Sequence, residues 1–347
     1  MFRCVIYMML HLFNPFRFSV NWTHYVLREV GPLQQRKPQD LGHRIHLIDG
    51  YDLGMPGRTG TYVIDEEQLT IIETGPSPSV PYILEGLKQL QLNTADVKYI
   101  IVTHIHLDHA GGAGRLLQHC PNAEVIVHPR GARHLADPSR LIAGARAVYG
   151  EKFDQLFDPV VPVPEDRLVI KEDGDTLSIG ANRTLHFWDT PGHAAHHFSM
   201  YDPVSNGIFA GDNVGIRFHH TEDVNVTFYI PSTSPNQFDP EAMMRSMQKF
   251  RESGAERLYL GHFGMTSDVE QAYEQVSDWI PRFVEQGKEA LAENEGVEGI
   301  VKRLSSMMRQ YLTERGVPED HDVYKILEMD LKVCAMGIID YLQKQQR

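Results

Sequence analysis

The chain has 347 residues, of which 42% are hydrophobic and 23% charged, the balance of an ordinary globular protein that can bury a sizeable core. Its net charge of −13 at pH 7 argues against nucleic acid or an anionic membrane surface as the main partner. The cysteines, Cys4, Cys120 and Cys334, are too few and too widely spaced for a disulfide framework or a zinc finger, and they fit a reducing compartment. The 18 histidines point instead to metal or proton chemistry.

The first 40 residues are expected to form a leader ahead of the folded chain. The segment MFRCVIYMMLHLF begins like a secretory signal, with a basic residue before an apolar run. His11 interrupts this run, Asn14 and Pro15 soon follow it, and it is too short to span a bilayer. No small-residue cleavage site follows, so a peripheral or flexible leader, or an over-long gene start, is expected. The localisation predicted from these features is cytoplasmic.

From residue 41 onward, short β-type runs alternate with turns and helical patterns. Strands are predicted over 43–50, 61–67, 69–75, 99–104 and 123–129, with helices over 80–92 and 113–120. A second β-rich set covers 184–193, 197–203, 207–213 and 257–263, with a helix over 240–250. From residue 268 the pattern is helical, with breaks near Gly296 and at 316–318. This order predicts an α/β core over 41–265 and a C-terminal helical extension over 266–347.

The segment HIHLDH carries four ligand-type side chains within six residues, at the end of an apolar strand: His104, His106, Asp108 and His109. Neutral imidazole and carboxylate groups suit Zn²⁺, Fe²⁺, Mn²⁺ or similar ions. One ion cannot comfortably take all four ligands from so short a segment, so two neighbouring ions are the economical interpretation. The alternative is a polar surface loop, which would require this arrangement to arise by chance.

Further ligand candidates follow later strands. His193 comes directly after Pro-Gly in DTPGHAAHH, Asp212 follows the apolar run IFAG, and His262 follows LYLG. Taken singly, each match is weak, because a lone histidine at a strand end is more often structural. Together and in this order, the three residues strengthen the prediction of a two-metal site.

This series, H-x-H-x-D-H followed by TPGH, GD and GH, resembles the metallo-β-lactamase fold superfamily of hydrolases over residues 42–264. The resemblance implies an α+β fold, a four-layer αββα sandwich with metals at one edge of two facing sheets. ETG at 73–75 resembles the family's D-T-G turn, with Glu73 at a position that supports the site without ligating metal. The implied ligands are His104, His106 and His193 for one metal, Asp108, His109 and His262 for the other, and Asp212 as the bridge between them.

The resemblance also implies a dinuclear hydrolase in which a metal-activated water attacks an ester-type bond. Zinc is the first choice of metal, with iron, manganese or cobalt as alternatives, and Asp108 could also pass a proton to the leaving group. The motif is nearest to the lactonase and glyoxalase-II-like thioesterase branches, so a small-molecule lactone, thioester or other acyl ester is expected. A phosphodiesterase, or an iron-dependent sulfur dioxygenase or other redox protein on the same fold, remains an alternative. The full ligand set argues against a binding protein without chemistry.

The long connection 214–235 is expected to contribute a lid or wall through its aromatic residues and His219-His220. Tyr229 is the candidate for a hydroxyl near the developing oxyanion, because lactonases of this type use a tyrosine there. The alternative is that Tyr229 packs in a core or lid. His196 and His197 are expected to support ligands or lie on the surface. The C-terminal helices could bury against the main domain, cap the mouth of the active site or form a homodimer face.

Overall fold

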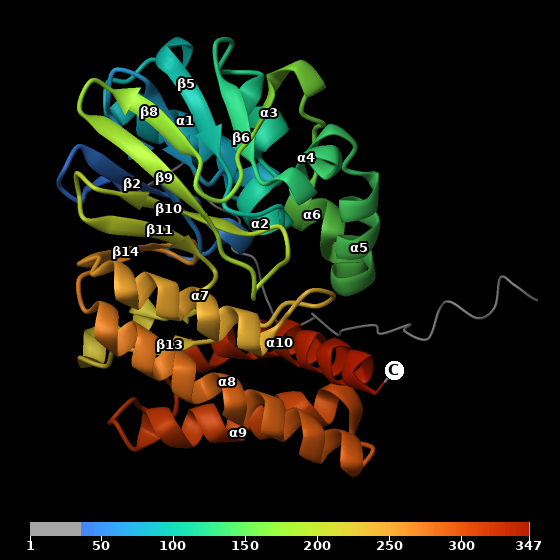
Figure 1. Cartoon of the computed structure of the whole chain (residues 1–347). Coiled ribbons are helices and arrows are strands. Elements are labelled where there is room, and N and C mark those ends of the chain that lie inside the picture. The colour runs from blue at the N-terminus through green and yellow to red at the C-terminus, as the bar shows by residue number, and fades with distance from the viewer. Residues whose placement is uncertain (1–35, 347) are drawn as a thin grey trace, which may run out of the picture.

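The structure is a computed structural model that describes residues 36–346, so the leader up to residue 35 lies outside the described part. Two β-sheets face each other, and helices cover the outer face of each (Figure 1). This arrangement is the four-layer αββα sandwich expected from the sequence, followed by the expected C-terminal helices. Within residues 36–346, no helix is both long enough and apolar enough to cross a membrane.

The first sheet has seven strands that lie side by side in chain order. The first four strands pair antiparallel, whereas β4 to β7 pair parallel. Its strands are β1 (Gln39–Asp40), β2 (Ile45–Asp49), β3 (Gly60–Ile64), β4 (Leu69–Ile72), β5 (Val97–Ile101), β6 (Glu124–Val127) and β7 (Leu168–Ile170). Parallel pairing requires crossover helices, which are α1 (Val80–Gln89) and α3 (Ala113–Leu117). The segment after β5 therefore begins at the carboxyl edge of this sheet.

The second sheet has six strands in the order β15-β14-β11-β10-β9-β8. All neighbours pair antiparallel except β11 and β14, which are parallel and are joined through α7 (Pro240–Ser253). The strands are β8 (Thr176–Gly180), β9 (Arg183–Asp189), β10 (Phe198–Asp202), β11 (Gly207–Gly211), β14 (Arg257–Leu260) and β15 (Met265–Thr266). A separate two-stranded ribbon pairs β12 (Ile216–Arg217) with β13 (Tyr229–Ile230).

The side chains of each strand point alternately to its two faces, and this divides the apolar core into layers. Ile101 on β5 packs between the sheets with Phe187 and Phe209, whereas its neighbour Ile100 packs under the helices of the first sheet. Successive strand residues point to opposite faces, so a strand that is apolar on both faces belongs in the middle of a covered sheet. Each predicted strand overlaps an observed one, but β3, β5 and β9 begin one or two residues before the predicted range, and the predicted ranges extend past the observed ends.

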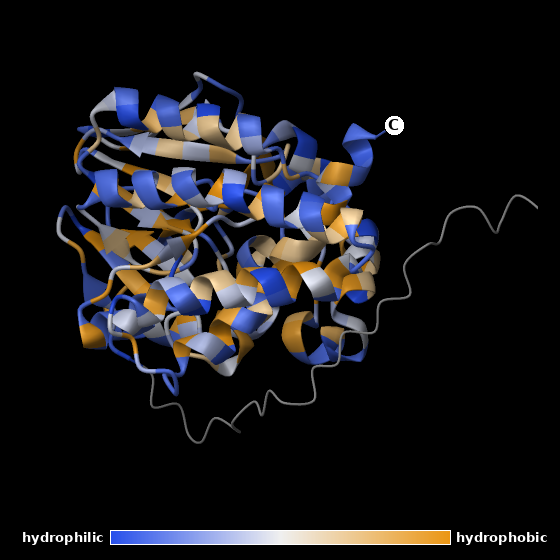
Figure 2. Cartoon of the chain, turned by 90° about the horizontal axis from the view of Figure 1, so that it is seen from below, coloured by the Kyte–Doolittle hydropathy of each residue, from blue (hydrophilic) through white to orange (hydrophobic). Residues whose placement is uncertain are grey.

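The C-terminal helices are α8 (Val269–Ala292), α9 (Gly296–Thr313) and α10 (Val323–Gln345). They lie below the second sheet in Figure 1 and share one continuous apolar cluster with it, in which Ile208 and Leu258 meet Trp279 and Ile338. Figure 2 shows hydrophilic and hydrophobic residues alternating along these helices, as expected for helices that bury one face.

Residues 129–157 contain three helices where the sequence interpretation assigned no element: α4 (Pro129–Ala136), α5 (Ser139–Tyr149) and α6 (Phe153–Phe157). Phe153, Leu156 and Phe157 form a small apolar cluster with Leu107, which anchors α6 beside the histidine motif. This segment therefore forms one wall of the region described next.

Candidate metal centre

The histidine motif lies in the segment that joins β5 to α2 (Leu107–Ala110). The amide of Thr103 donates to Oε1 of Glu73 at 3.2 Å, and the carbonyl of Thr103 accepts from the amide of Phe198 at 2.9 Å. These bonds fix the segment to the first sheet on one side and to β10 of the second sheet on the other. His106 directly precedes α2, whose single turn carries the next two motif residues.

The remaining ligand candidates come from strand ends of the second sheet. His193 lies in the turn between β9 and β10, Asp212 directly follows β11, and His262 lies two residues after β14. Gly261 lets the backbone approach the cluster closely. A Cβ at this position would lie 2.7 Å from Cε1 of His109 and 2.8 Å from Oδ1 of Asp212. Any side chain there would therefore displace site residues.

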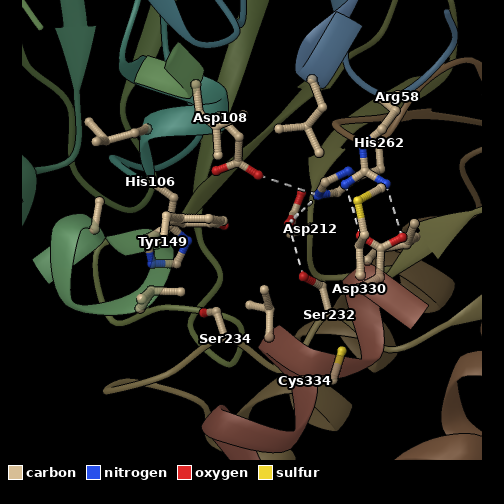
Figure 3. Close-up of a pocket in the computed structure, with 18 of the residues that line it drawn as sticks. Arg58, His106, Asp108, Tyr149, Asp212, Ser232, Ser234, His262, Asp330 and Cys334 are labelled. Carbon is tan, nitrogen blue, oxygen red and sulfur yellow. Dashed lines mark hydrogen bonds and ion pairs between the residues drawn. The ribbon is translucent and has the colours of Figure 1, made fainter. Parts of the chain in front are cut away.

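The seven predicted ligand side chains meet at this edge of the sandwich. Nδ1 of His106 lies 2.8 Å from Nε2 of His193, and Oδ2 of Asp212 lies 3.1 Å from Nε2 of His262. Figure 3 shows Asp108, Asp212 and His262 pointing toward one another. Three groups offer ligand atoms that lie within 4.8 Å of one another: His104, His106 and His193; His104, His109 and Asp212; and Asp108, His109 and His262.

The donor atoms of this cluster fit a metal. Nε2 of His104, Nε2 of His109 and Oδ1 of Asp212 are buried without a hydrogen-bond partner among the described residues. Leaving such atoms unsatisfied costs about 1–3 kcal/mol each, whereas a divalent cation would satisfy several of them at once. Nδ1 of His193 donates to the carbonyl of Ser232 at 2.9 Å, so Nε2 carries the lone pair that faces the cluster.

The electrostatics divide the histidines of the cluster into two groups. Burial lowers the pKa of His104 and His106 well below the usual imidazole value, and neighbouring histidines lower it further, so both rings are neutral. Burial alone would raise the pKa of Asp212, but the positive charges of His109 and His262 hold it well below its usual value. His104 and His106 thus present neutral imidazoles beside the ionised carboxylate of Asp212. Burial alone would lower the pKa of His109 and His262, but the charge of Asp212 raises it above the usual imidazole value.

A set of hydrogen-bonding groups behind the cluster orients it. Oε2 of Glu73 lies 3.5 Å from Nδ1 of His109, the arrangement in which a carboxylate fixes a ligating imidazole. Ser232 Oγ donates to Oδ2 of Asp212 at 3.0 Å, and the Asp212 amide donates to Nε2 of His197 at 3.2 Å. His197 therefore supports a site residue, as expected. Sequence reasoning missed Ser232, because the segment PSTSP carries no spacing signal.

The cluster forms the floor of a cavity of about 800 Å³. Its walls come from the 53–58 loop, from α5 and α6, from the 232–237 segment and from α10. His106, Asp108, His193, Asp212 and His262 face this cavity, as do His196 and His220. Cys334 also borders the cavity but is 2% exposed, and burial raises the pKa of its thiol to about 12, so this thiol is a poor nucleophile.

The prediction that Tyr229 is catalytic disagrees with its position. Tyr229 lies on β13, is fully buried in the cluster shared by the second sheet and the C-terminal helices, and is not among the described residues that line the cavity. Its amide donates to the side chain of Gln275 on α8 at 3.1 Å, which ties the ribbon to the extension. The packing alternative fits this position. His220 from the same connection does reach the cavity wall.

Comparison with known proteins identifies the family. Residues 54–262 match the sequence profile of the Metallo-beta-lactamase superfamily. The chain belongs to this superfamily. The metallo-beta-lactamase fold-containing protein ST1585 of Sulfurisphaera tokodaii is 27% identical over 227 residues, which cover 64% of this chain and 79% of that protein. The N-acyl homoserine lactonase AttM of Agrobacterium fabrum is 27% identical over 170 residues, covering 48% of this chain and 57% of AttM.

Solved structures share the fold. The metallo-beta-lactamase family protein TTHA1429 from Thermus thermophilus superposes with a TM-score of 0.59 at 20% identity, covering 87% of this chain and 94% of that one. The beta-lactamase-like protein 2 homolog of Caenorhabditis elegans is 23% identical in sequence over 235 residues, which cover 67% of this chain. The matched region spans 64% of the nematode protein and 57% of AttM, less than two thirds of each.

Proposed function

We propose that this member of the superfamily is a dinuclear metal-dependent hydrolase that cleaves an acyl bond in a small molecule, as a lactone, thioester or other acyl ester. The observation that carries the proposal is the convergence of seven ligand-type side chains, several with unsatisfied buried donor atoms, at the floor of a cavity. Zinc is the first choice of metal, because imidazole and carboxylate ligands suit it, and iron, manganese and cobalt accept the same set.

The ligand assignment follows the observed groups. His104, His106 and His193 would hold one ion, and Asp108, His109 and His262 the other. Asp212 would bridge them, because one of its carboxylate oxygens lies 3.6 Å from Nε2 of His193 in the first group and the other lies 3.3 Å from Nε2 of His109 in the second. Bound ions of this kind lower the pKa of a water and polarise the carbonyl under attack.

The chain's own residues supply positioning and proton transfer. The side chain of Asp108 is 28% exposed and borders the cavity, whereas that of Asp212 is 2% exposed. Asp108 is thus the carboxylate of the cluster that a substrate can touch, and we assign it the transfer of a proton to the leaving group. Glu73 and Ser232 hold His109 and Asp212 in place from behind.

Similarity to AttM, named as an N-acyl homoserine lactonase, supports an acyl substrate. The cavity supports it as well, because many of its lining side chains are aliphatic, Leu53, Leu141, Val148 and Val333 among them. An apolar wall stabilises hydrocarbon groups better than it stabilises the charges of a phosphodiester. The proposed partner is accordingly a small molecule.

The test is metal content per chain in anaerobically purified protein, with lactone, thioester and phosphodiester turnover measured on the same samples. Asp212→Ala should lose metal and acyl-bond turnover together. The matched control is Asp278→Ala, because Asp278 lies on the exposed side of α8 and far from the cluster in sequence. Two ions per chain and hydrolysis of one acyl class support the proposal. One iron per chain, with oxygen uptake on a persulfide, would instead assign a sulfur dioxygenase, and turnover of phosphodiesters alone would assign a phosphodiesterase.

A further inference from the structure

Helix α5 turns an apolar stripe toward the cavity. Leu141, Gly144, Ala145, Val148 and Tyr149 line it, at the three- and four-residue spacing of one helical face. No residue of α5 is buried within the described part of the chain, so these apolar side chains are only partly covered by protein. A helix normally buries its apolar stripe against a core. Here Leu141, Ala145 and Tyr149 pack in part against the small cluster around Phe153, and the uncovered part of the stripe faces the cavity.

Helix α10 presents a second apolar stripe to the same cavity. Ile326, Met329 and Val333 follow the same spacing and line the wall that α10 contributes. Figure 3 shows Tyr149 and Cys334 at different sides of the cavity, with the cluster residues Asp108, Asp212 and His262 above them. A ligand that covers both stripes would therefore have one end at the cluster.

Two cations of the lining form ion pairs that the structure shows, and two others, Arg140 and Lys152, border the cavity beyond the two ends of the apolar stripe on α5. Arg58 borders the cavity but forms a two-point ion pair with Asp330 on α10, with N–O distances of 2.8 and 3.0 Å. Lys325, at the other end of the stripe, pairs with Asp322 at 2.8 Å. The cavity volume of about 800 Å³ falls within the usual range for small-molecule sites, roughly 300–1,000 Å³. An uncharged, elongated group of a small molecule is the occupant that fits.

We propose, building on the hydrolase function above, that the substrate carries a medium or long apolar acyl chain that lies between α5 and α10, with its carbonyl at the histidine and aspartate cluster. Each methylene group of the bound chain would be transferred from water to contact with an apolar wall. Burial of a methylene corresponds to a gain of about fourfold in binding, so turnover should depend strongly on chain length.

Gly144 sets the room available to that chain. Glycine weakens a helix interior relative to alanine, so a glycine there is usually explained by a neighbour that needs the space. At Gly144 a Cβ would meet no described atom within 4 Å, and the position borders the cavity. No protein neighbour explains the glycine, and a bound chain would. A Cβ can be added here without a clash in the protein.

The experiment uses the metal-loaded protein and nitrophenyl esters of straight-chain acids, from acetyl to dodecanoyl. In the wild type, kcat/KM should rise about fourfold per methylene until the cavity is filled. In Gly144→Phe the ring occupies the path of the chain, so decanoyl and dodecanoyl esters should lose at least about tenfold in kcat/KM while acetyl and butyryl esters keep theirs. The matched control is Ala147→Phe, which adds the same ring on the exposed side of the same helix, away from the lining.

Binding of decanoate and butyrate, measured by calorimetry on the metal-free protein, is independent of turnover. Decanoate should bind wild type and Ala147→Phe alike and Gly144→Phe at least about tenfold more weakly. Val148→Asn, on the lining face, is a second variant with the same expected loss should Gly144→Phe fail to fold. Hydrolysis with a flat chain-length profile, or equal profiles for the two phenylalanine variants, would overturn this inference and leave the hydrolase intact. No hydrolysis at any length, with decanoate binding as expected, would overturn the hydrolase and leave the chain-binding site.

Discussion

The buried ion pair between Arg58 and Asp330 joins the loop after β2 to α10, and its removal should loosen the C-terminal helices. The two side chains are 8% and 6% exposed. Burial alone would lower the pKa of Arg58, but the charge of Asp330 holds it above its usual value. In Asp330→Ala, the buried guanidinium keeps only Asp52, whose nearest carboxylate oxygen is 3.7 Å away. Removing one partner of a buried pair costs about 3–5 kcal/mol, and because Asp52 compensates in part, we expect a loss of about 3 kcal/mol.

Urea unfolding followed by circular dichroism measures this loss. The control is Asp278→Ala, whose pair with Arg282 on α8 is about half exposed on both sides, so its removal should cost less than about 1 kcal/mol. The double variant Arg58→Met with Asp330→Leu should recover most of the stability, because the penalty comes from an unpaired buried charge and not from a lost attraction. A single variant as stable as the control, or a double variant no better than the single one, would refute this reasoning.

Three further predictions follow from the site. Tyr229→Phe should leave kcat within about twofold of the wild-type value, because Tyr229 lies in the core and away from the cavity lining. If the Tyr229 hydroxyl instead stabilised the oxyanion, kcat should fall by about a hundredfold. Glu73→Gln should weaken metal binding by about 10–100-fold in a chelator titration, because its carboxylate faces Nδ1 of His109, and an unchanged affinity would remove Glu73 from the site. Burial raises the pKa of the Cys120 and Cys334 thiols to about 12. At about pH 8 both thiols should therefore react with a disulfide reagent more than about a hundredfold faster in the unfolded protein than in the folded protein. Rapid labelling of either cysteine in the folded protein would contradict its burial.

The fold could be predicted because its signals are local and ordered along the chain. Strands such as β4, β10 and β11 are short apolar runs bounded by glycine or polar turns, and each appears within the predicted range. The ligand candidates directly follow strand ends, and strand ends of two facing sheets meet at one edge. For that reason, the positions of histidine and aspartate residues relative to the predicted strands were sufficient to predict side chains that the structure brings together.

The cavity wall could not be predicted, because the apolar side chains of α5 that form it face a cavity and do not pack fully against another helix or sheet. The stripe on α5 is interrupted by Gly144 and only partly covered by the small cluster around Phe153, so the segment reads as a polar connection between strands. Tyr229 was wrongly assigned for a related reason. An aromatic residue in a long connection can face a cavity or a core, and pairing of the two-residue strands β12 and β13 decides which. Neither outcome is encoded in the local pattern.

Helix α10 explains why the C-terminal extension packs as one unit with the candidate site. One side of this helix, with Ala335, Ile338 and Leu342, packs in the cluster that also covers the second sheet. Another side, with Met329 and Val333, lines the cavity. A helix that is apolar around most of its circumference must be covered on several sides, and here protein covers one side while the cavity borders another. The boundary at residue 266 therefore marks a change in the sequence pattern, from mixed strands and helices to helices alone. It does not separate two independently packed units, because α10 completes both the core of the second sheet and the wall of the site.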